Sequence, residues 1–315
     1  MKDNFFGNVD NELKRVLHFF PNGGMNLENI DEAREIMINS YKSFSPSENI
    51  HIENKEIGSI FEKNKIKLRI YTPKKEIKEK YPILLWMHGG GYLVGNLDTS
   101  DMWASFLCEN ANIIVVSVDY RLAPENIYPS PIHDSYSALK WISLNTNLKF
   151  DKNNIIVGGD SAGGGLATCL SLYNRDYGDV SIKYQLLLYP MLDDKNTKKE
   201  ENDKEYYIWN KDNNLKAWTY YLGYNPENRE VPIYASPLRC KNLSNMPKTF
   251  IGIGGIDLFL QENIEYAKNL LISGISTEFH IYPDAYHAFP DFEPLAKISK
   301  NLKRDILNAL KKVLD

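Results

Sequence analysis

Apolar residues follow a helical period in the first part of the chain and a strand period after it. Before residue 50 they recur every three or four positions in two groups: Leu13, Val16, Leu17 and Phe20, then Ile30, Ala33, Ile36 and Met37. This spacing places an apolar stripe along one side of a helix. Residues 1–48 are therefore predicted to form N-terminal helices that precede a sheet.

Eight short apolar or alternating segments follow, each with a length typical of a β-strand. They lie at residues 50–57, 66–71, 83–87, 113–118, 155–157, 184–189, 250–253 and 279–282. From residue 83 onward these segments are rich in Val, Ile and Leu on both faces, as in a sheet covered by helices on both sides. Helical stretches, such as 133–144, 163–173 and 262–272, separate them. The alternation predicts an α/β fold with an eight-stranded, mostly parallel, doubly wound sheet.

The segment between the sixth and seventh strands is too long for an ordinary crossover. Residues 193–231 begin with a run rich in Lys, Glu, Asp and Asn, up to residue 204. They also hold several large aromatic residues, among them Tyr206, Tyr207, Trp209, Trp218, Tyr220 and Tyr221. We interpret this insertion as a lid over a pocket, with Trp209 and Trp218 among the pocket residues. A solvated helical insertion with a few packing aromatics is the alternative. In either case, the predicted core comprises the residues on both sides of the insertion, 49–192 and 232–315.

Composition and charge narrow the class of protein. Hydrophobic residues make up 43% of the 315 positions and charged residues 25%, which is typical of a globular protein and not of a disordered one. The formal net charge is −4, the pI is near 5.9 and basic residues alternate with acidic ones, so no nucleic-acid partner is expected. Cys108, Cys169 and Cys240 are widely separated without a C-x-x-C motif. They are expected to be reduced thiols.

Neither a secretory signal nor a membrane span is expected from the sequence. The first residues include Lys2 and Asp3 and no long apolar run. No later segment approaches the roughly 18 apolar residues that a membrane helix requires. The predicted location is the cytoplasm.

A serine nucleophile is indicated by Gly159-Asp160-Ser161-Ala162-Gly163, which fits the pattern G-x-S-x-G. The apolar strand at 155–157 leads into this motif, and a small-residue helix leads out of it. A serine on so sharp a turn has strained backbone angles, and the residues two positions away must be glycine to avoid clashes. The following helix directs its amide dipoles toward the reacting oxygen. The pattern has little weight alone and much more in this strand-to-helix context.

A second motif, His88-Gly89-Gly90-Gly91-Tyr92, directly follows the apolar strand at 83–87. Consecutive glycines allow the backbone to approach a substrate and direct N–H groups to a developing oxyanion. The predicted donors are the amides of Gly89, Gly90 and Ala162. His88 is expected to brace the loop, and Tyr92 is a candidate pocket residue. By itself, the motif is also compatible with a flexible turn or a phosphate-binding loop.

A general base and an acid must accompany the serine, because a serine hydroxyl is a poor nucleophile at its ordinary pKa. After a G-x-S-x-G turn they follow in the order acid, then histidine, each after a later strand. Asp257 is the first acid after the seventh strand, 96 residues beyond Ser161. His287 is the only histidine after the eighth strand, 30 residues further on. Order and spacing fit a triad of Ser161, His287 and Asp257.

Other acids and histidines fit the triad less well. Asp284 is too close in sequence to His287 to serve easily from another strand, and Glu262 is expected within the following helix. The remaining histidines are assigned no catalytic role: His18, His51, His133 and His280. No metal-binding or nucleotide-binding motif is present, so no cofactor is expected.

Taken together, these segments resemble the hormone-sensitive-lipase-like family of α/β-hydrolases, the bacterial type IV esterases. The resemblance covers the chain from about residue 65 to the end. It rests on His88 to Gly91, Tyr-Arg-Leu-Ala-Pro-Glu at 120–125, Gly-Asp-Ser-Ala-Gly-Gly at 159–164, Ser-Pro-Leu at 236–238, Asp257 and His287. It implies an α/β-hydrolase fold with a helical cap, built from residues 1–48 and 193–231. It also implies a carboxylesterase for short or medium acyl esters, without a cofactor, and suggests a homodimer.

Three positions depart from the family pattern. Leu258 follows the acid where Pro is usual, Gln261 stands where an acidic residue is common, and Ala288 follows the histidine where Gly is usual. The first two bear on the assignment of Asp257. The third concerns the loop that carries His287.

Two other functions remain open from the sequence alone. An amidase or formamidase uses the same triad, and the residues do not distinguish the leaving group. The plant gibberellin receptors, which bind a ligand on this scaffold, lack the catalytic histidine. His287 is present here, which disfavours a receptor.

Overall fold

The computed structural model describes residues 8–20, 24–75, 79–145, 149–196 and 206–314. In this part of the chain, eight strands form one sheet in the order β1-β2-β4-β3-β5-β6-β7-β8. Their bounds are β1 Ile50–Gly58, β2 Lys65–Pro73, β3 Tyr81–Met87, β4 Ile114–Asp119, β5 Phe150–Asp160, β6 Ile182–Leu188, β7 Lys248–Gly254 and β8 Thr277–Tyr282. The pairs β1–β2 and β2–β4 are antiparallel, and the other pairs are parallel. The predicted eight-stranded, mostly parallel sheet is confirmed.

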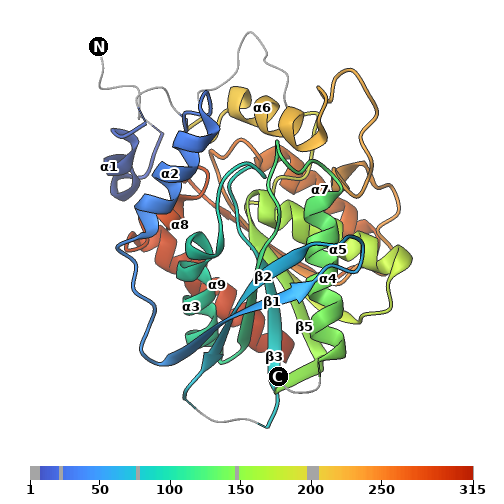
Figure 1. The fold of residues 1–315 in the computed structure, drawn as a ribbon. Helices are drawn as coiled ribbons and strands as arrows, with labels where there is room; N and C mark the ends of the chain where they lie inside the picture. Colours follow the sequence, from blue (N-terminus) through green and yellow to red (C-terminus); the bar gives the residue numbers. More distant parts are fainter. Residues whose placement is uncertain (1–7, 21–23, 76–78, 146–148, 197–205, 315) are drawn as a thin grey trace, which may run out of the picture.

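Helices cover both faces of the sheet (Figure 1). On one face α3 (Leu97–Ala111) packs beside α9 (Lys297–Leu314). On the other face lie α4 (Ser130–Leu144), α5 (Ala162–Tyr177) and α7 (Leu260–Ile272). Because both faces are covered, strands such as β3 and β4 are almost wholly buried, which explains their continuous apolar sequences. The remaining short helices are η1 (Asn11–Leu13), α1 (Lys14–Leu17), η2 (Pro237–Arg239) and α8 (Phe289–Phe292).

The side chain of Arg34 links the helix α2 (Ile30–Tyr41) to the core by hydrogen bonds. Its Nε donates to the carbonyl oxygen of Leu93 at 2.8 Å, and its Nη2 donates to that of Ala123 at 2.9 Å. Both terminal nitrogens also donate to the carboxylate of Glu125, at 2.8 and 2.7 Å. Arg34 therefore connects the N-terminal region to the loops after β3 and β4.

The N-terminal region also contacts the insertion that contains α6 (Lys211–Leu222). Gly24 forms a parallel bridge with Ile208, and the amide of Met25 donates to the carbonyl of Ile208 at 3.2 Å. The side chain of Asn213 donates to the carbonyl of Met25 at 2.9 Å. Figure 1 shows α2 and α6 at the same end of the molecule. Of the predicted segments, residues 1–7 and 21–23 and most of the polar run that ends at residue 204 lie outside the described residues.

The first described helices, η1 and α1, have a different position from α2. The amide of Asp10 donates to the carbonyl of Asp284 at 3.0 Å, and the hydroxyl of Tyr286 donates to the carbonyl of Leu13 at 3.1 Å. Arg15 forms an ion pair with Glu293 at 3.0 Å. This segment consequently packs against the loop that carries His287.

None of the described helices is long and apolar enough to cross a membrane. Cys108, Cys169 and Cys240 are all free and buried. Burial raises the pKa of the Cys169 thiol far above its usual value, so this thiol is protonated at neutral pH.

Candidate active site

Ser161 occupies the turn between the end of β5 and the start of α5. Its backbone has φ 53° and ψ −120°, a left-handed conformation that L-residues rarely adopt. The turn is tight enough that a Cβ on Gly163 would collide with the carbonyl oxygen of Met87, and one on Gly159 would collide with Gly163. The two glycines of the motif therefore allow β3 and α5 to approach the strained serine closely.

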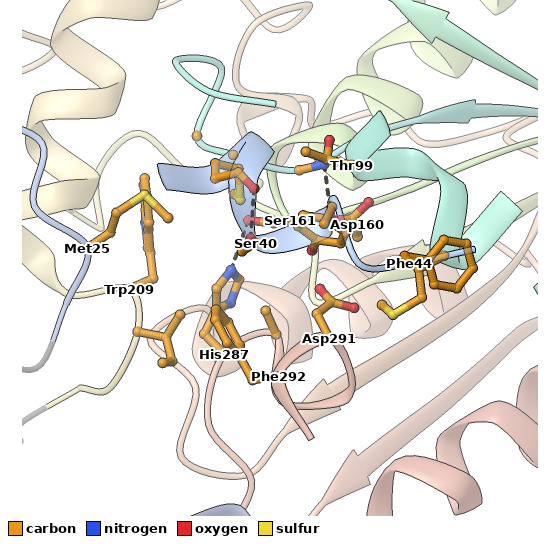
Figure 2. A pocket seen from close by; sticks show the side chains of 18 residues that line it. Met25, Ser40, Phe44, Thr99, Asp160, Ser161, Trp209, His287, Asp291 and Phe292 are labelled. Carbon is orange, nitrogen blue, oxygen red and sulfur yellow. Dashed lines mark hydrogen bonds between the residues drawn. The ribbon is translucent and has the colours of Figure 1, made fainter. Parts of the chain in front are cut away.

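Three loops at the carboxyl ends of β5, β7 and β8 bring the predicted triad together, and Figure 2 shows Ser161 beside His287. The Oγ of Ser161 lies 2.9 Å from Nε2 of His287. The Nδ1 of His287 lies 2.8 Å from Oδ2 of Asp257. All three residues are buried. An unbroken chain of hydrogen bonds thus runs from the serine hydroxyl to the carboxylate.

The histidine and its acid are held by further contacts. The amide of Phe259 donates to Oδ1 of Asp257 at 2.8 Å, which leaves Oδ2 for the imidazole. The rings of Tyr189 and Phe259 pack edge-on against His287, with centroids 5.2 and 5.0 Å away. Ala288 has φ 57°, so the position where the family usually has Gly is indeed left-handed.

The competing acids have other partners or positions. Glu262 lies in α7, where its carboxylate accepts the amide of Leu192 at 2.6 Å and the side-chain nitrogen of Asn196 at 2.9 Å. Asp284 lies in the exposed turn after β8. Neither approaches His287 as Asp257 does.

The other histidines also lie in structural positions. His133 stacks on Phe61, with ring centroids 3.9 Å apart. His280 pairs with Glu278 at 2.9 Å within β8.

His88 contacts the glycine-rich loop and the start of the loop after β4. Its Nδ1 lies 2.7 Å from the carbonyl oxygen of Gly89, and its ring stacks on Tyr120 at 4.4 Å. The hydroxyl of Tyr120 donates to the carbonyl of His88 at 2.7 Å. Burial lowers the pKa of His88 to about 4, so the imidazole is neutral near pH 7 and serves as a packing and hydrogen-bonding group.

The predicted set of oxyanion donors needs one correction. The amide of Gly89 donates to Oδ2 of Asp160 at 3.0 Å, so this N–H is already paired within the protein. For the amides of Gly90 and Ala162, the described part of the chain provides no hydrogen-bond partner. Gly90 has φ +110°, and a Cβ there would collide with the carbonyl of Val94. The amides of Gly90 and Ala162 therefore remain candidate oxyanion donors, as does that of Gly91 on the cavity wall, whereas the amide of Gly89 is bonded to Asp160.

A cavity of about 310 Å³ opens beside Ser161 and His287 (Figure 2). Its wall combines the nucleophile region, the glycine loop, α2, α3, α8 and the insertion. The lining residues are Met25, Met37, Ser40, Tyr41, Phe44, Gly89, Gly90, Gly91, Thr99, Met102, Asp160, Ser161, Ile208, Trp209, His287, Ala288, Asp291 and Phe292. Of the candidate pocket residues, Trp209 lies on this wall.

The other two candidate pocket residues, Tyr92 and Trp218, are not on this wall. Both are completely buried. The ring of Tyr92 stacks on that of Tyr221 at 3.8 Å and lies 6.2 Å from that of Trp218. Their rings, together with that of Tyr221, pack α6 onto the glycine loop. The structure therefore places both residues in the packing beneath α6 and away from this cavity wall.

The sequence interpretation missed the cavity residues of α2, α3 and α8. These are chiefly Met37, Tyr41, Met102 and Asp291. Asp291 had one local signal, an acid between aromatic residues four positions after His287. The others have the apolar spacing of ordinary core residues, so only the tertiary structure places them at the site.

Fold and site together define the class of protein. A serine on a strained strand-to-helix turn, followed by an acid and a histidine on later loops, is the arrangement of the α/β-hydrolases. Residues 84–291 match the model of a family described by the alpha/beta hydrolase fold. The chain belongs to this family.

Several relatives extend over nearly the whole chain. Carboxylesterase NlhH of Mycobacterium tuberculosis is 31% identical over 311 residues, 97% of this chain and 96% of that protein. Esterase LipI of the same organism is 32% identical over 250 residues, 78% of each. The solved structure of a bacterial heroin esterase has a TM-score of 0.90 at 31% identity, covering 98% of this chain and 99% of that one. The resemblance to the hormone-sensitive-lipase-like esterases is confirmed, and the protein is a carboxylic ester hydrolase with a Ser-His-Asp triad.

Proposed function

We propose that this carboxylesterase hydrolyses esters of short to medium acyl chains through an acyl-enzyme intermediate on Ser161. The observation that carries the proposal is the hydrogen-bonded chain of Ser161, His287 and Asp257 at the edge of a cavity. A cavity of about 310 Å³ is at the lower end of the range for small-molecule sites, which favours compact substrates.

The arrangement supports the following sequence of steps. The Oγ of Ser161 attacks the ester carbonyl while Nε2 of His287 accepts the hydroxyl proton. Asp257 holds the imidazole in the tautomer with hydrogen on Nδ1 and stabilises the imidazolium. His287 then protonates the leaving alcohol, and water repeats the attack on the acyl-enzyme.

The tetrahedral intermediate is stabilised in this proposal by the amides of Gly90 and Ala162. Each such donor contributes about 3 kcal/mol to the transition state in comparable sites. Asp160 acts indirectly, because it holds the amide of Gly89 and so fixes the loop that presents Gly90.

A panel of p-nitrophenyl esters tests the proposed acyl range. The value of kcat/KM is expected to be highest between acetate and octanoate and about tenfold or more lower for palmitate, because a long chain does not fit the cavity. Steady-state kinetics at one pH, with the same detergent concentration for every ester, measures kcat/KM across the series. A maximum at palmitate would contradict the proposal.

A paired amide separates the esterase from an amidase with the same triad. The anilide p-nitroacetanilide is expected to react at least about tenfold more slowly than p-nitrophenyl acetate, because amide cleavage requires a protonated amine leaving group. Equal kcat/KM for both compounds would favour the amidase.

We also propose that residues 1–48 and 193–231 together form the cap. Support comes from the contacts of Met25 with Ile208 and Asn213, and from the places of Met37, Tyr41 and Trp209 on the cavity wall. Arg34 then determines how α2 sits over the site, since it is bonded to the carbonyls of Leu93 and Ala123.

Replacing Arg34 by methionine is expected to destabilise the protein by about 1–2 kcal/mol and to raise KM several-fold. The change removes hydrogen bonds from a charged donor and loosens α2, whereas the triad lies on other elements. Urea unfolding and steady-state kinetics measure both effects. Arg304→Met is the matched control, because Arg304 is exposed and bonded only to its helix neighbours Asn301 and Asp305. Equal effects of the two substitutions would contradict this role of Arg34.

A cytoplasmic location and a homodimer complete the proposal. The free, buried cysteines support a reducing compartment. The dimer follows from the family resemblance, and light scattering coupled to size exclusion distinguishes it from the monomer of 36.3 kDa.

A further inference from the structure

The active-site cavity has acidic side chains on its wall and no basic one. Apart from His287, its ionisable lining residues among those described are Asp160, Asp291 and Tyr41, and none is Lys or Arg. Asp160 and Asp291 are enclosed by protein yet keep partial solvent access, since they face the cavity. The mechanism uses Asp160 to fix the glycine loop but assigns nothing to Asp291.

Asp291 is held in place by two donors from distant parts of the chain. Its Oδ1 accepts the indole N–H of Trp103 at 2.6 Å, and its Oδ2 accepts the hydroxyl of Tyr189 at 2.9 Å. A carboxylate offers about four acceptor positions, so two remain after these bonds. Figure 2 shows Asp291 in the same cavity as Ser161 and His287. The two hydrogen bonds therefore fix the orientation of the carboxylate and occupy about half of its acceptor positions.

Burial raises the pKa of both carboxyl groups on the cavity wall. Burial raises the pKa of Asp160 well above its usual range, and the neighbouring Asp291 raises it further. Burial raises the pKa of Asp291 to about 6, opposed by the hydrogen bonds from Tyr189 and Trp103. Burial and the neighbouring Asp291 both favour the protonated form of Asp160, whereas Asp291, with its pKa of about 6, is mostly ionised at pH 7.5.

Among the described residues that line the cavity, no Lys or Arg neutralises Asp291. Lys303 of α9 is close enough to lower the pKa of Asp291, but its Nζ lies over the ring of Trp103, 5.9 Å from the centroid, and it does not line the cavity. A carboxylate in such surroundings is costly without a paired positive charge. A substrate can supply that charge.

The rest of the wall suits a soft cation. Aromatic rings and thioethers dominate it, chiefly Phe44, Trp209, Phe292, Met25, Met37 and Met102. Aromatic faces attract ammonium groups, and the combination of such faces with an acid is how proteins recognise quaternary ammonium ligands. Thioether sulfurs add polarisable contacts.

We infer that the cavity selects esters that carry a positively charged ammonium group, and that Asp291 is the residue that determines this specificity. The inference rests on the proposed esterase function, which supplies the reaction. To that function the inference adds that the preferred ester carries a positive charge. An ester of the same shape without the charge leaves Asp291 unpaired and binds less well.

Two pairs of esters with matched shapes test the inference. In the first, acetylcholine is compared with 3,3-dimethylbutyl acetate, which replaces the charged nitrogen by carbon on the alcohol side. In the second, ethyl 4-(trimethylammonio)butyrate is compared with ethyl 5,5-dimethylhexanoate, which does the same on the acyl side. Each ratio of kcat/KM is divided by the ratio of alkaline hydrolysis rates, to remove intrinsic reactivity. At least one pair is expected to favour the charged ester about tenfold or more at pH 7.5.

Substitution of the acid identifies the source of the preference. In Asp291→Asn the corrected ratio for the favoured pair is expected to fall about tenfold, toward unity, because the amide keeps an acceptor but has no charge. Ser40→Ala is the matched control, since Ser40 lines the same cavity without charge and its hydroxyl bonds to Met37 in its own helix. The ratio is expected to stay unchanged in the control.

The wild-type enzyme provides a measurement that does not depend on a stable variant. The corrected ratio is expected to decline between pH 8 and pH 5, as Asp291 takes up a proton, because the quaternary ammonium does not titrate. The groups that face Asp291 are Tyr189, Trp103, Tyr41, Asp160, His287 and Lys303. His287 serves both esters of a pair, so its effect on turnover cancels in the ratio.

The outcomes separate the inference from the function on which it rests. Corrected ratios near or below unity for both pairs, with brisk hydrolysis of the neutral esters, overturn the inference and leave the esterase intact. A preference that survives in Asp291→Asn and at pH 5 overturns the role of Asp291. Failure to hydrolyse any ester of either pair or of the p-nitrophenyl series overturns the proposed function.

Discussion

Alanine in place of Ser161 is expected to lower kcat for p-nitrophenyl acetate by about a millionfold. The substitution removes the only atom positioned to form the acyl-enzyme, the Oγ that lies 2.9 Å from Nε2 of His287. The fold should persist, because the side chain forms no other hydrogen bond in the described structure and the strained turn depends on the backbone and the flanking glycines. Initial rates, corrected for the uncatalysed hydrolysis, measure kcat. Circular dichroism measures whether the fold persists.

Ser171→Ala is the matched control for this prediction. Ser171 is also buried, in the same helix α5, where its hydroxyl donates to the carbonyl of Ala167 at 2.9 Å. Its loss is expected to leave kcat within about threefold of the wild type. Turnover by Ser161→Ala above a few per cent of the wild-type rate would show that another nucleophile does the chemistry.

Asparagine in place of Asp257 is expected to lower kcat by about ten-thousandfold, as for the equivalent change in other triads. The structure gives a specific reason. Oδ1 of Asp257 accepts the amide of Phe259, so the asparagine oxygen should keep that position and its NH₂ group should face Nδ1 of His287. The imidazole is then forced into the tautomer with hydrogen on Nε2, which cannot accept the proton of Ser161. Single-turnover kinetics with p-nitrophenyl acetate measures the acylation step directly.

Asp284→Asn separates this effect from a general loss of negative charge near the histidine. Asp284 is three residues from His287 and lies in the exposed turn after β8. Its replacement is expected to change kcat by no more than about threefold. A large loss from Asp284→Asn with little effect of Asp257→Asn would reverse the assignment of the acid.

Local patterns were sufficient to predict the sheet and the triad. The apolar strand before each motif, the glycines around Ser161 and the order of acid and histidine depend on residues close in sequence. The length of β5 was underestimated, because its first residues, such as Lys152 and Asn153, are exposed and polar and do not look like a buried strand.

The errors concern contacts between residues far apart in the chain. The amide of Gly89 is paired with Asp160, 71 residues away, so its sequence neighbours carry no sign that it is unavailable. Aromatic residues at helical spacing do not reveal whether they face a cavity or a dry interface, which is why Trp209 and Trp218 received the same interpretation. Asp291 depends on Trp103 and Tyr189, 188 and 102 residues away.

The central claim is that Ser161, activated by His287, forms a covalent intermediate. Stoichiometric treatment with a fluorophosphonate, followed by intact-mass measurement and peptide mapping, tests it most directly. The account predicts one phosphonyl group per chain, attached to Ser161, with ester hydrolysis lost in proportion to labelling. Attachment at another residue, or full hydrolytic activity after Ser161 has been completely labelled, would contradict it.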